Sequence, residues 1–375
     1  MDYFRTIQTK IEENLFKGKI IILYGARQVG KTTLTREIIK KHDNARYINC
    51  ELIQYRTSLE TTNSEFLKDF LGNYKLVILD EAQSVKNIGM TLKIIVDTYP
   101  NIQIIATGSS SFDLANKLSE PLTGRSRIYR LYPFSWQEIL PYSDLPTMVS
   151  KVETLLRFGS YPEVYGKPEE LAIENLSNIA SNYLYKDILH FENLKRPDIL
   201  INLLRALALQ IGHEVSYNEL SNLLKENINT IIRYIELLEK AFVIYRLPSF
   251  SRNLRSEISR GQKIYFYDLG IRNSLINNFN KLELRNDIGG LWENFCVIER
   301  LKRNENNRRF VNTYFWRTYQ QKEIDYLEEA EGAYRCFEFK YNLRRKSKYP
   351  KEFIETYENS SFETITKENF YKFIS

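Results

Sequence analysis

The stretch Gly25-Ala26-Arg27-Gln28-Val29-Gly30-Lys31-Thr32 decides the fold, because it matches the pattern G-x-x-x-x-G-K-[ST] at every fixed position. It follows the apolar run 20–24, which predicts a buried parallel strand, and it opens a helix predicted over residues 31–41. Glycines in such a loop let backbone N–H groups turn toward phosphate oxygens, and the helix N-terminus adds positive potential there. The stretch therefore predicts a nucleotide-binding loop.

The polar residues of this loop have separate predicted roles. Lys31 is expected to reach the β- and γ-phosphates of ATP, and the Thr32 hydroxyl is expected to ligate Mg²⁺. The alternative is a glycine-rich turn that fits the pattern by chance, which the flanking strand and helix disfavour. The predicted nucleotide-binding residues are Gly25, Ala26, Arg27, Gln28, Val29, Gly30, Lys31, Thr32 and Thr33.

A second apolar run, residues 76–79, ends in the two acids Asp80 and Glu81. Nucleotide hydrolases need acids at such a strand end, beside the phosphate loop. Asp80 is predicted to hold Mg²⁺ through its water shell, and Glu81 to act as general base on the attacking water. The alternative is that these acids only begin a surface loop.

Three further residues are candidates for a part in hydrolysis. The predicted strand 102–106 is followed by Thr107-Gly108-Ser109-Ser110-Ser111, where Ser109 or Ser110 either senses the γ-phosphate or caps the next helix. Arg125 and Arg127 are candidate arginine fingers that would act on the nucleotide of a neighbouring subunit in a homo-oligomer. The alternative is an ordinary surface pair.

The remaining pattern predicts three more regions. Strands at 46–50 and 128–131 complete an alternation of strands and helices, which indicates a parallel sheet covered on both faces. Residues 132–248 are predicted to be mainly helical, and two short helices around the break 225–227 indicate a helix-turn-helix. Residues 241–267 alternate like a β-hairpin wing, and strands are predicted at 314–316, 324–327 and 334–340.

Asp325, Glu338 and Lys340 form the pattern D-x₁₂-E-x-K on the last two of these strands. Glu338 and Lys340 are two residues apart and so share one strand face, and Asp325 is expected beside Glu338. Two carboxylates and a cation, completed by Glu293 on the preceding helix, are suited to hold Mg²⁺ or Mn²⁺ against a phosphodiester. The alternative is a cross-strand ion pair.

Taken together, these motifs resemble one family, the prokaryotic AAA-type ATPases that carry a C-terminal DUF4143 domain. The resemblance covers nearly the whole chain, and the linked order of the motifs is more specific than any one of them. Besides the phosphate loop, it rests on Leu79-Asp80-Glu81-Ala82-Gln83, Thr107-Gly108-Ser109-Ser110, Leu131-Tyr132-Pro133-Phe134-Ser135, Phe158-Gly159-Ser160-Tyr161-Pro162-Glu163, Leu291-Trp292-Glu293-Asn294-Phe295 and Glu338-Phe339-Lys340.

This resemblance implies an α/β multidomain protein. Its parts would be a P-loop AAA+ parallel-sheet ATPase core at 1–135, a helical subdomain at 136–200, a winged helix-turn-helix at 201–270 and an α/β domain similar to PD-(D/E)XK nucleases at 271–375. It assigns the phosphate loop to nucleotide, Asp80 and Glu81 to Mg²⁺ and water, and Asp325, Glu338 and Lys340 to the nuclease motif.

Basic residues make DNA a candidate partner. Arg233 is expected to face outward on the second helix of the helix-turn-helix, although Glu236 and Glu239 on that helix disfavour contact with phosphates. The predicted wing also carries Lys263. The predicted nucleic-acid contacts are Arg233, Arg252, Arg255, Arg344, Arg345 and Lys346.

Composition excludes several classes of protein. The chain has 375 residues, 43% of them hydrophobic, and 53 Lys and Arg against 47 Asp and Glu, which give a net charge of +6. No stretch has the roughly 18 uncharged apolar residues of a membrane-spanning helix. The three scattered cysteines indicate no disulfide framework, and the start of the chain has no signal-peptide pattern, so a cytoplasmic location is expected.

The sequence thus predicts a Mg²⁺-dependent ATPase coupled to a nuclease-like domain that acts on DNA, branched DNA included. Two alternatives stay open. One is an ATP-operated switch that binds a protein partner without nuclease chemistry. The other is a DNA-binding regulator of transcription.

Overall fold

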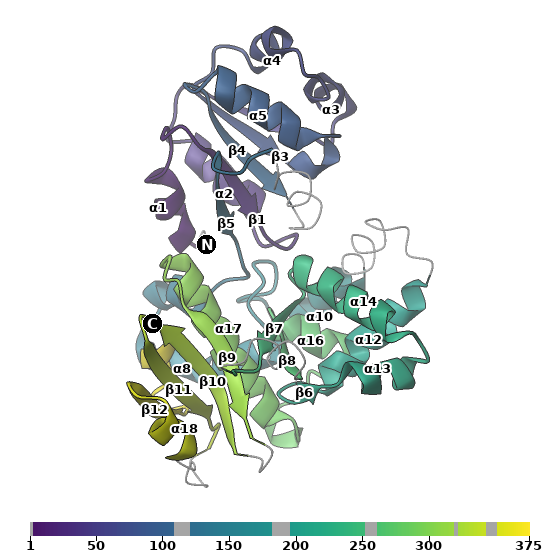
Figure 1. Cartoon of the computed structure of the whole chain (residues 1–375), viewed down its shortest axis with the longest axis vertical. Coiled ribbons are helices and arrows are strands. Elements are labelled where there is room, and N and C mark those ends of the chain that lie inside the picture. Colours follow the sequence, from purple (N-terminus) through teal and green to yellow (C-terminus); the bar gives the residue numbers. More distant parts are fainter. Residues whose placement is uncertain (1–2, 109–120, 182–195, 252–260, 319–321, 343–350) are drawn as a thin grey trace. The chain divides into compact units, whose positions relative to one another are not determined.

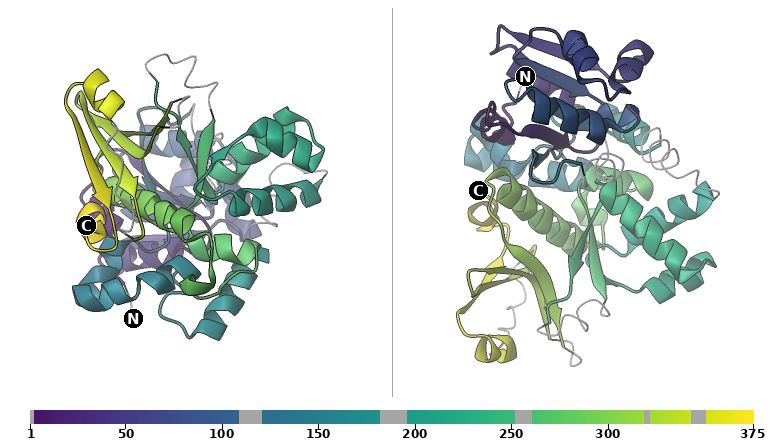
Figure 2. Two further views of the ribbon diagram at one scale, coloured as in Figure 1. Left: turned by 90° about the horizontal axis from the view of Figure 1, so that it is seen from below. Right: turned by 45° about the horizontal axis from the view of Figure 1, so that its top comes forward.

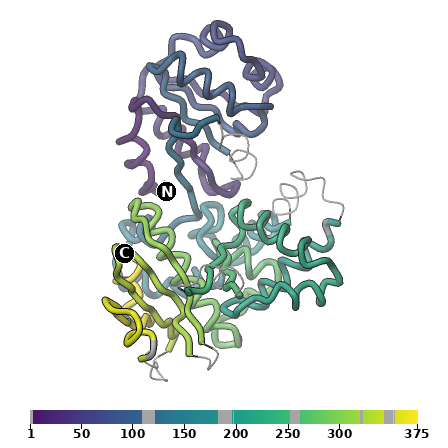
Figure 3. The backbone as a smooth tube through the Cα atoms, viewed as in Figure 1, coloured from purple at the N-terminus to yellow at the C-terminus, as the bar shows by residue number. Residues whose placement is uncertain are grey.

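The structure is a computed structural model and describes most of the chain in six segments: residues 3–108, 121–181, 196–251, 261–318, 322–342 and 351–375 (Figure 3). The chain divides into two compact units. The first, here the ATPase unit, consists of residues up to Tyr132 together with Lys240–Phe242. The second, here the C-terminal unit, holds Pro133–Glu239 and Val243–Ser375.

Five parallel strands form the core of the ATPase unit, in the order β2-β3-β4-β1-β5 (Figure 1). Strands β1, β3 and β4 are buried at every position, as expected for apolar runs in a sheet covered on both faces. The parallel sheet predicted from the sequence is therefore confirmed. The strands are β1 (Ile20–Tyr24), β2 (Ala45–Asn49), β3 (Leu76–Asp80), β4 (Gln103–Gly108) and β5 (Ser126–Arg130).

Helices flank this sheet. Helix α2 starts where the phosphate loop ends and packs against β2, β3 and β4. Because β4 lies between β1 and β3, the carboxyl ends of these three strands meet at one edge. The described helices of the unit are α1 (Thr6–Glu12), α2 (Lys31–Ile39), α3 (Ile53–Leu59), α4 (Ser64–Leu71), the short η1 (Ala82–Ser84) and α5 (Ile88–Thr98).

The first half of the C-terminal unit is mainly helical, as predicted. Ser216 caps α13 by accepting a hydrogen bond from the Glu219 N–H at 3.3 Å, and Lys225 turns the chain with φ 54° before α14. The described helices are α7 (Trp136–Ile139), η2 (Leu140–Tyr142), α8 (Leu145–Ser150), α9 (Val152–Phe158), α10 (Glu169–Ile179), α12 (Pro197–Leu209), α13 (Tyr217–Leu224), α14 (Ile228–Lys240), α16 (Leu269–Leu275) and η4 (Leu282–Leu284).

The predicted wing is a hairpin of β7 (Ile244–Pro248) and β8 (Gln262–Phe266), with the short β6 (Glu214–Val215) beside β8. It is not an exposed wing. The Phe250 N–H, just beyond β7, donates to the Phe315 carbonyl at 2.7 Å, and Lys263 in β8 is buried. Lys263 therefore does not lie on an exposed wing, because the hairpin packs against the C-terminal sheet.

The C-terminal sheet has the order β12-β11-β10-β9, with β11 and β12 parallel and the other pairs antiparallel. Figure 2 shows this sheet and α17 from two sides. A buried ion pair between Arg300 and Glu328, at 2.7 Å, joins α17 to β10. The sequence did not predict β12. The elements are α17 (Ile288–Asn306), β9 (Asn312–Arg317), β10 (Glu323–Ala330), β11 (Ala333–Phe339), α18 (Lys351–Thr356), β12 (Ser360–Ile365) and α19 (Phe370–Ile374).

Within the described segments, no helix combines the length and the apolar character that crossing a bilayer requires.

Candidate active site

The phosphate loop connects β1 to α2, and its two motif glycines have separate structural reasons. A Cβ atom at Gly25 would lie 2.2 Å from the carbonyl oxygen of Leu131, so no side chain fits there. Gly30 has φ 97° and forms the N-terminal cap of α2, a conformation that side chains rarely allow. The loop geometry thus depends on glycine at both positions.

Lys31 lies inside the loop. Its side chain is buried, at 5% exposure, and its Nζ atom donates to the carbonyl oxygens of Gly25 and Ala26, both at 2.9 Å. The ammonium therefore lies at the centre of the curled backbone, which is the position expected for a lysine that contacts phosphate oxygens.

Asp80, at the end of β3, brings three hydroxyl groups together. Its Oδ2 atom accepts hydrogen bonds from Thr32 Oγ1, at 2.8 Å, and from the Tyr47 hydroxyl, while Oδ1 accepts one from Thr107. Burial and the neighbouring carboxylate raise the pKa of Tyr47, so this phenol stays a proton donor. The four side chains come from β2, β3, β4 and the start of α2.

The Thr32 hydroxyl and the Asp80 carboxylate fit Mg²⁺. Both offer hard oxygen atoms, and they lie 2.8 Å apart at the loop that would hold the phosphates. Magnesium at such sites keeps several waters and shares substrate phosphates, so it does not need a cage of protein carboxylates.

Glu81 follows directly and has a positive φ of 52°, which is rare for a residue with a side chain and is typical of functional positions. Its N–H donates to Thr107 Oγ1 at 3.1 Å, and Gln83 Nε2 donates to its carboxylate. Glu81 is thus held at the edge where β1, β3 and β4 end.

The roles of Tyr47 and Thr107 were not predicted from the sequence. Thr107 is the first residue after the predicted strand 102–106 and is polar, which is the signal that could have identified it. The candidate sensor Ser109 lies outside the described residues. Thr107 is the described side chain at the end of β4 that contacts both acids.

We expect Thr107→Val to lower kcat for ATP by roughly 10–100-fold, because it removes the hydroxyl that donates to the Asp80 carboxylate and accepts from the Glu81 backbone N–H, with little change in side-chain volume. Steady-state phosphate release measures this effect. Thr91→Val is a matched control, since its buried hydroxyl donates to the Leu59 carbonyl, at 2.8 Å, away from both acids. Equal kcat values for the two variants would exclude a role for Thr107 in turnover.

Arg125 and Arg127 lie at the amino end of β5, where Ser126 pairs with Ile20 and Arg127 with Ile21. The phosphate loop follows the opposite end of β1, so these arginines are remote from the loop of their own chain. Arg125 Nε contacts Asp97 Oδ1 at 2.7 Å on the surface. An arginine finger at either position would therefore act on another copy.

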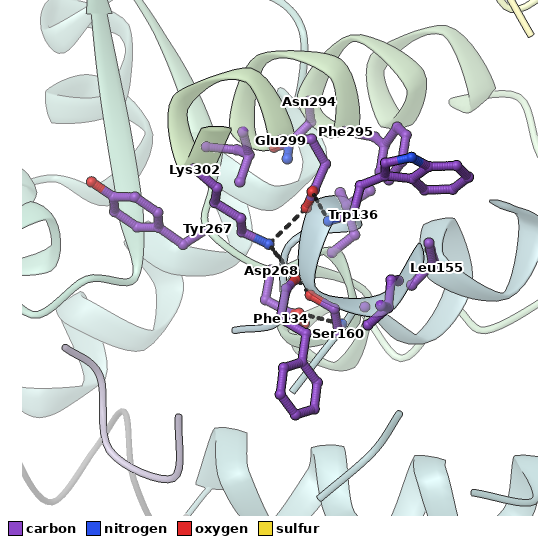
Figure 4. Close-up of a pocket in the computed structure, with 14 residues that line it drawn as sticks. Phe134, Trp136, Leu155, Ser160, Tyr267, Asp268, Asn294, Phe295, Glu299 and Lys302 are labelled. Atoms are coloured by element: carbon purple, nitrogen blue, oxygen red, sulfur yellow. Dashed lines mark hydrogen bonds and ion pairs between the residues drawn. The ribbon is translucent and has the colours of Figure 1, made fainter. Parts of the chain in front are cut away.

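Figure 4 shows the residues around a small cavity in the C-terminal unit. Its volume of about 20 Å³ is enough for roughly one water molecule. Around it, Lys302 Nζ donates to Glu299 at 2.8 Å and to the Phe134 carbonyl at 3.1 Å, and Asp268 accepts from the Ser160 N–H at 2.7 Å. This polar cluster fixes the segments around Phe134 and Ser160 to α17.

The structure brings the C-terminal carboxylates together as predicted. Lys340 Nζ contacts Glu338 Oε1 at 2.8 Å, and Asp325 Oδ2 accepts a hydrogen bond from the Phe339 N–H at 2.8 Å. Asp325 on β10 therefore lies beside the end of β11. Burial opposes the charge of Lys340, but Glu338, Asp325 and Glu293 together raise its pKa, so Glu293 on α17 contributes to the same cluster.

Lys263, which sequence analysis placed elsewhere, is the centre of this cluster. Its ammonium contacts Glu293 at 2.8 Å, Glu323 at 2.6 Å and Asp325 at 3.8 Å. Burial opposes its charge, but the three carboxylates outweigh that effect and raise the pKa of Lys263. Burial also raises the pKa of Glu293, to about 7, against the opposing effect of Lys263.

In this arrangement the C-terminal carboxylates do not fit a divalent metal ion, because the Lys263 ammonium lies among them. Over the described ranges, no group of three His, Cys, Asp or Glu side chains is placed to hold a metal.

Of the predicted DNA contacts, Arg233 is exposed on α14, as expected. The other candidates, Arg252, Arg255, Arg344, Arg345 and Lys346, lie outside the described residues.

Three family models match consecutive parts of the chain. An AAA domain (AAA_14) matches residues 17–140, a domain of unknown function (DUF8612) matches residues 149–282, and DUF4143, also of unknown function, matches residues 288–371. The phosphate loop, Asp80 and Glu81 lie in the first match, and Asp325, Glu338 and Lys340 lie in the third.

Curated relatives match along most of the chain. An uncharacterized protein of Methanocaldococcus jannaschii is 29% identical over 96% of this chain and 87% of its own length. An uncharacterized protein of Mycobacterium tuberculosis is 26% identical over 90% of this chain and 73% of its own. Among solved structures, a Walker-type ATPase of Pyrococcus abyssi has a TM-score of 0.49 and 18% identity, covering 72% of this chain and 94% of that chain.

The order of these matches agrees with the fold, in which a parallel-sheet P-loop unit precedes a helical region and a C-terminal sheet. The chain therefore combines an AAA domain at residues 17–140 with a DUF4143 domain at residues 288–371.

Proposed function

We propose that this chain binds and hydrolyses ATP at residues 25–32, and that nucleotide binding operates a conformational switch. The observation that carries the first part is the set of hydrogen bonds around Asp80, which joins Thr32 of the phosphate loop to Thr107 and, through it, to Glu81. These hydroxyls satisfy the buried Asp80 carboxylate, and one of them, Thr32, belongs to the phosphate loop, where Mg²⁺ would be held.

In this proposal each residue has one task. Lys31 orients the β- and γ-phosphates, and Thr32 and Asp80 hold Mg²⁺, which when bound neutralises charge on the phosphates. Glu81, held by Gln83 and Thr107, takes the proton of the attacking water. An arginine finger, Arg125 or Arg127, comes from a second copy of the chain.

Arg5 supports the switch. Its guanidinium, in a side chain that is only 6% exposed, donates to the Val29 carbonyl of the phosphate loop at 2.7 Å and to the Tyr132 carbonyl at 2.5 Å. The Tyr132 ring meets the Phe242 ring edge-on at 6.2 Å between centroids. All four residues belong to the ATPase unit.

These contacts lie where the chain leaves that unit. Tyr132 is followed by Pro133, and Phe242 follows α14 with φ 57°, a conformation that bulky residues rarely adopt. A change in the phosphate loop at Val29 therefore acts, through one buried guanidinium, on the backbone at Tyr132 and on the packing of Phe242. This arrangement fits a nucleotide-gated switch better than an independent domain on a linker.

We expect nucleotide to change amide hydrogen exchange in residues 240–248 by roughly fivefold or more in the wild-type chain, and this response to be lost in Arg5→Gln. The measurement uses saturating ADP or a slowly hydrolysed ATP analogue. Arg46→Gln is the control, because it removes a guanidinium of the same unit that contacts the Phe70 carbonyl instead. An unchanged response in Arg5→Gln would remove Arg5 from the coupling.

DNA cleavage at Asp325, Glu338 and Lys340 is the second candidate function, favoured by the neighbouring placement of these residues. Lys263 among the carboxylates argues against it. The test is a panel of labelled single-stranded, duplex, flap and four-way-junction DNA with Mg²⁺ or Mn²⁺, with and without ATP, beside Lys340→Ala. We expect no cleavage; cleavage that Lys340→Ala abolishes would establish the nuclease instead.

Regulation of transcription has less support. Among the described residues, Arg233 is the one member of the predicted DNA-contact set, and it is exposed. A defined DNA footprint that Arg233→Ala removes, with ATP optional, would favour that function. The domain boundaries at residues 135, 200 and 270, and a homo-oligomer that completes the ATP site, are part of the proposal.

A further inference from the structure

The C-terminal carboxylate cluster contains a charged group from a distant part of the chain. Lys263 comes from β8, in the hairpin, while Glu293 comes from α17 and Glu323 and Asp325 from β10. The Lys263 side chain is 3% exposed, and its Nζ atom lies 2.8, 2.6 and 3.8 Å from carboxylate oxygens of these three acids. The ammonium therefore occupies the point on which the carboxylates converge.

The carboxylates of the cluster also accept hydrogen bonds from other protein groups. Glu293 Oε1, which contacts Lys263, accepts a second hydrogen bond from the Tyr265 hydroxyl at 2.6 Å. Asp325 Oδ2 accepts from the Phe339 N–H at 2.8 Å, and Glu338 is paired with Lys340 at 2.8 Å. Each carboxylate of the D…E-x-K pattern thus already has a partner from the protein.

A divalent cation and the ammonium exclude each other here. Mg²⁺ needs oxygen ligands at roughly 2.0–2.1 Å in a near-octahedral arrangement, and it repels a fixed positive charge at the same point. A buried ammonium needs carboxylate partners, and it loses them if the metal takes the acids. Only one of the two cations can hold this cluster together.

The ammonium also joins elements that are far apart in the sequence. Lys263 fixes the hairpin to α17 and β10, and its Nζ atom lies 5.7 Å from the centroid of the Phe315 ring in β9. Next to it, the Asn294 side chain accepts from the Phe266 N–H at 2.7 Å and donates to the Phe266 carbonyl at 2.9 Å. The contacts of Lys263 are therefore part of a continuous attachment of β8 to α17.

We infer that the D…E-x-K cluster of this chain is a cation site filled by its own Lys263, which replaces a divalent metal ion and locks the β7–β8 hairpin to the C-terminal sheet. The cluster serves as an internal positioning site and takes no Mg²⁺ or Mn²⁺. The inference does not depend on ATP hydrolysis.

The first test needs no variant of Lys263. Mn²⁺ is titrated into nucleotide-free full-length protein and followed by electron paramagnetic resonance, for the wild type, Asp325→Asn and Asp80→Asn. We expect the titration of Asp325→Asn to superimpose on that of the wild type. The inference would be overturned if the wild type and Asp80→Asn bound a Mn²⁺ ion that Asp325→Asn did not bind. This outcome does not depend on whether the protein hydrolyses ATP.

The second test removes the ammonium. We expect Lys263→Met to lower the melting temperature by on the order of 10 °C, because three partly buried carboxylates lose their counter-charge. Millimolar Mn²⁺ should then restore several degrees in this variant but not in Lys263→Met/Asp325→Asn. Lys281→Met, which changes an exposed lysine, is the control and should melt like the wild type.

Two results would contradict the inference in this second test. One is a Lys263→Met variant that melts like the wild type, which would mean that the ammonium holds nothing together. The other is equal stabilisation of the wild type and Lys263→Met by Mn²⁺. If Lys263→Met does not fold, the Mn²⁺ titration of the wild type and Asp325→Asn still decides the question.

Discussion

Glu81→Gln is expected to bind ATP as tightly as the wild type and to lose turnover, with kcat reduced by roughly 10²–10⁴-fold. Glutamine keeps the shape of the side chain but cannot take a proton from the attacking water. The backbone N–H of residue 81 still donates to Thr107, so the edge of the sheet keeps its arrangement. Phosphate release measures kcat, and a fluorescent ATP analogue measures binding.

Glu65→Gln is the control for this prediction, because Glu65 is an exposed acid in the first turn of α4. It should hydrolyse ATP like the wild type. If Glu81→Gln turned over ATP as fast as the wild type, Glu81 would not be the general base. The proposed role of the hydrogen bonds around Asp80 in hydrolysis would then lose its support.

Gly25→Ala is expected to abolish nucleotide binding and to destabilise the ATPase unit. The new methyl group would lie 2.2 Å from the Leu131 carbonyl oxygen, which is backbone and has little freedom to move. The Leu131 N–H donates to the Tyr24 carbonyl at 2.7 Å, so strand pairing holds that segment in place. Relief of the overlap must come from the phosphate loop itself.

The free energy of unfolding should fall by roughly 1–3 kcal/mol, as in other overpacked sites. Chemical denaturation measures this change. Equilibrium binding of the ATP analogue measures whether the phosphate loop still binds nucleotide. Gly289→Ala is the matched control, since a Cβ atom there meets nothing within 4 Å. Undiminished ATP binding by Gly25→Ala would show that the loop tolerates a shift away from Leu131.

The parts of the site that the sequence predicted are those whose signals are local. Residues 20–24 and 76–79 are continuous apolar runs, so their burial in a parallel sheet follows from composition alone. The glycine spacing of the phosphate loop and the acids after β3 are equally local patterns. Strand β12 was missed because 360–365 alternates weakly and carries few apolar residues.

The rest depends on contacts between distant residues. Arg5 meets Val29 and Tyr132 across 24 and 127 residues of chain, and no spacing rule connects them. Tyr47 and Asp80 meet because β2 pairs with β3 in register, Asn49 opposite Asp80. Such partners become visible only once the order of the strands is known.

The position of Lys263 also depends on contacts between distant residues, and here the sequence pattern led to a wrong prediction. A lysine in an alternating strand is expected at the surface, because lysine is almost never fully buried without a partner. Its partners Glu293, Glu323 and Asp325 lie 30 or more residues further along the chain, on a helix and a different sheet. The sequence pattern therefore predicted Lys263 on an exposed wing, whereas in the structure its ammonium lies among three acids.

Hydrolysis of ATP by the full-length chain, beside Lys31→Ala, tests the central claim most directly. Phosphate released from ATP is followed with Mg²⁺ and again with EDTA. We predict Mg²⁺-dependent turnover by the wild type and none by Lys31→Ala, because the ammonium inside the loop is lost. Equal phosphate release by both proteins, or none by a folded wild type at any protein concentration, would contradict the account.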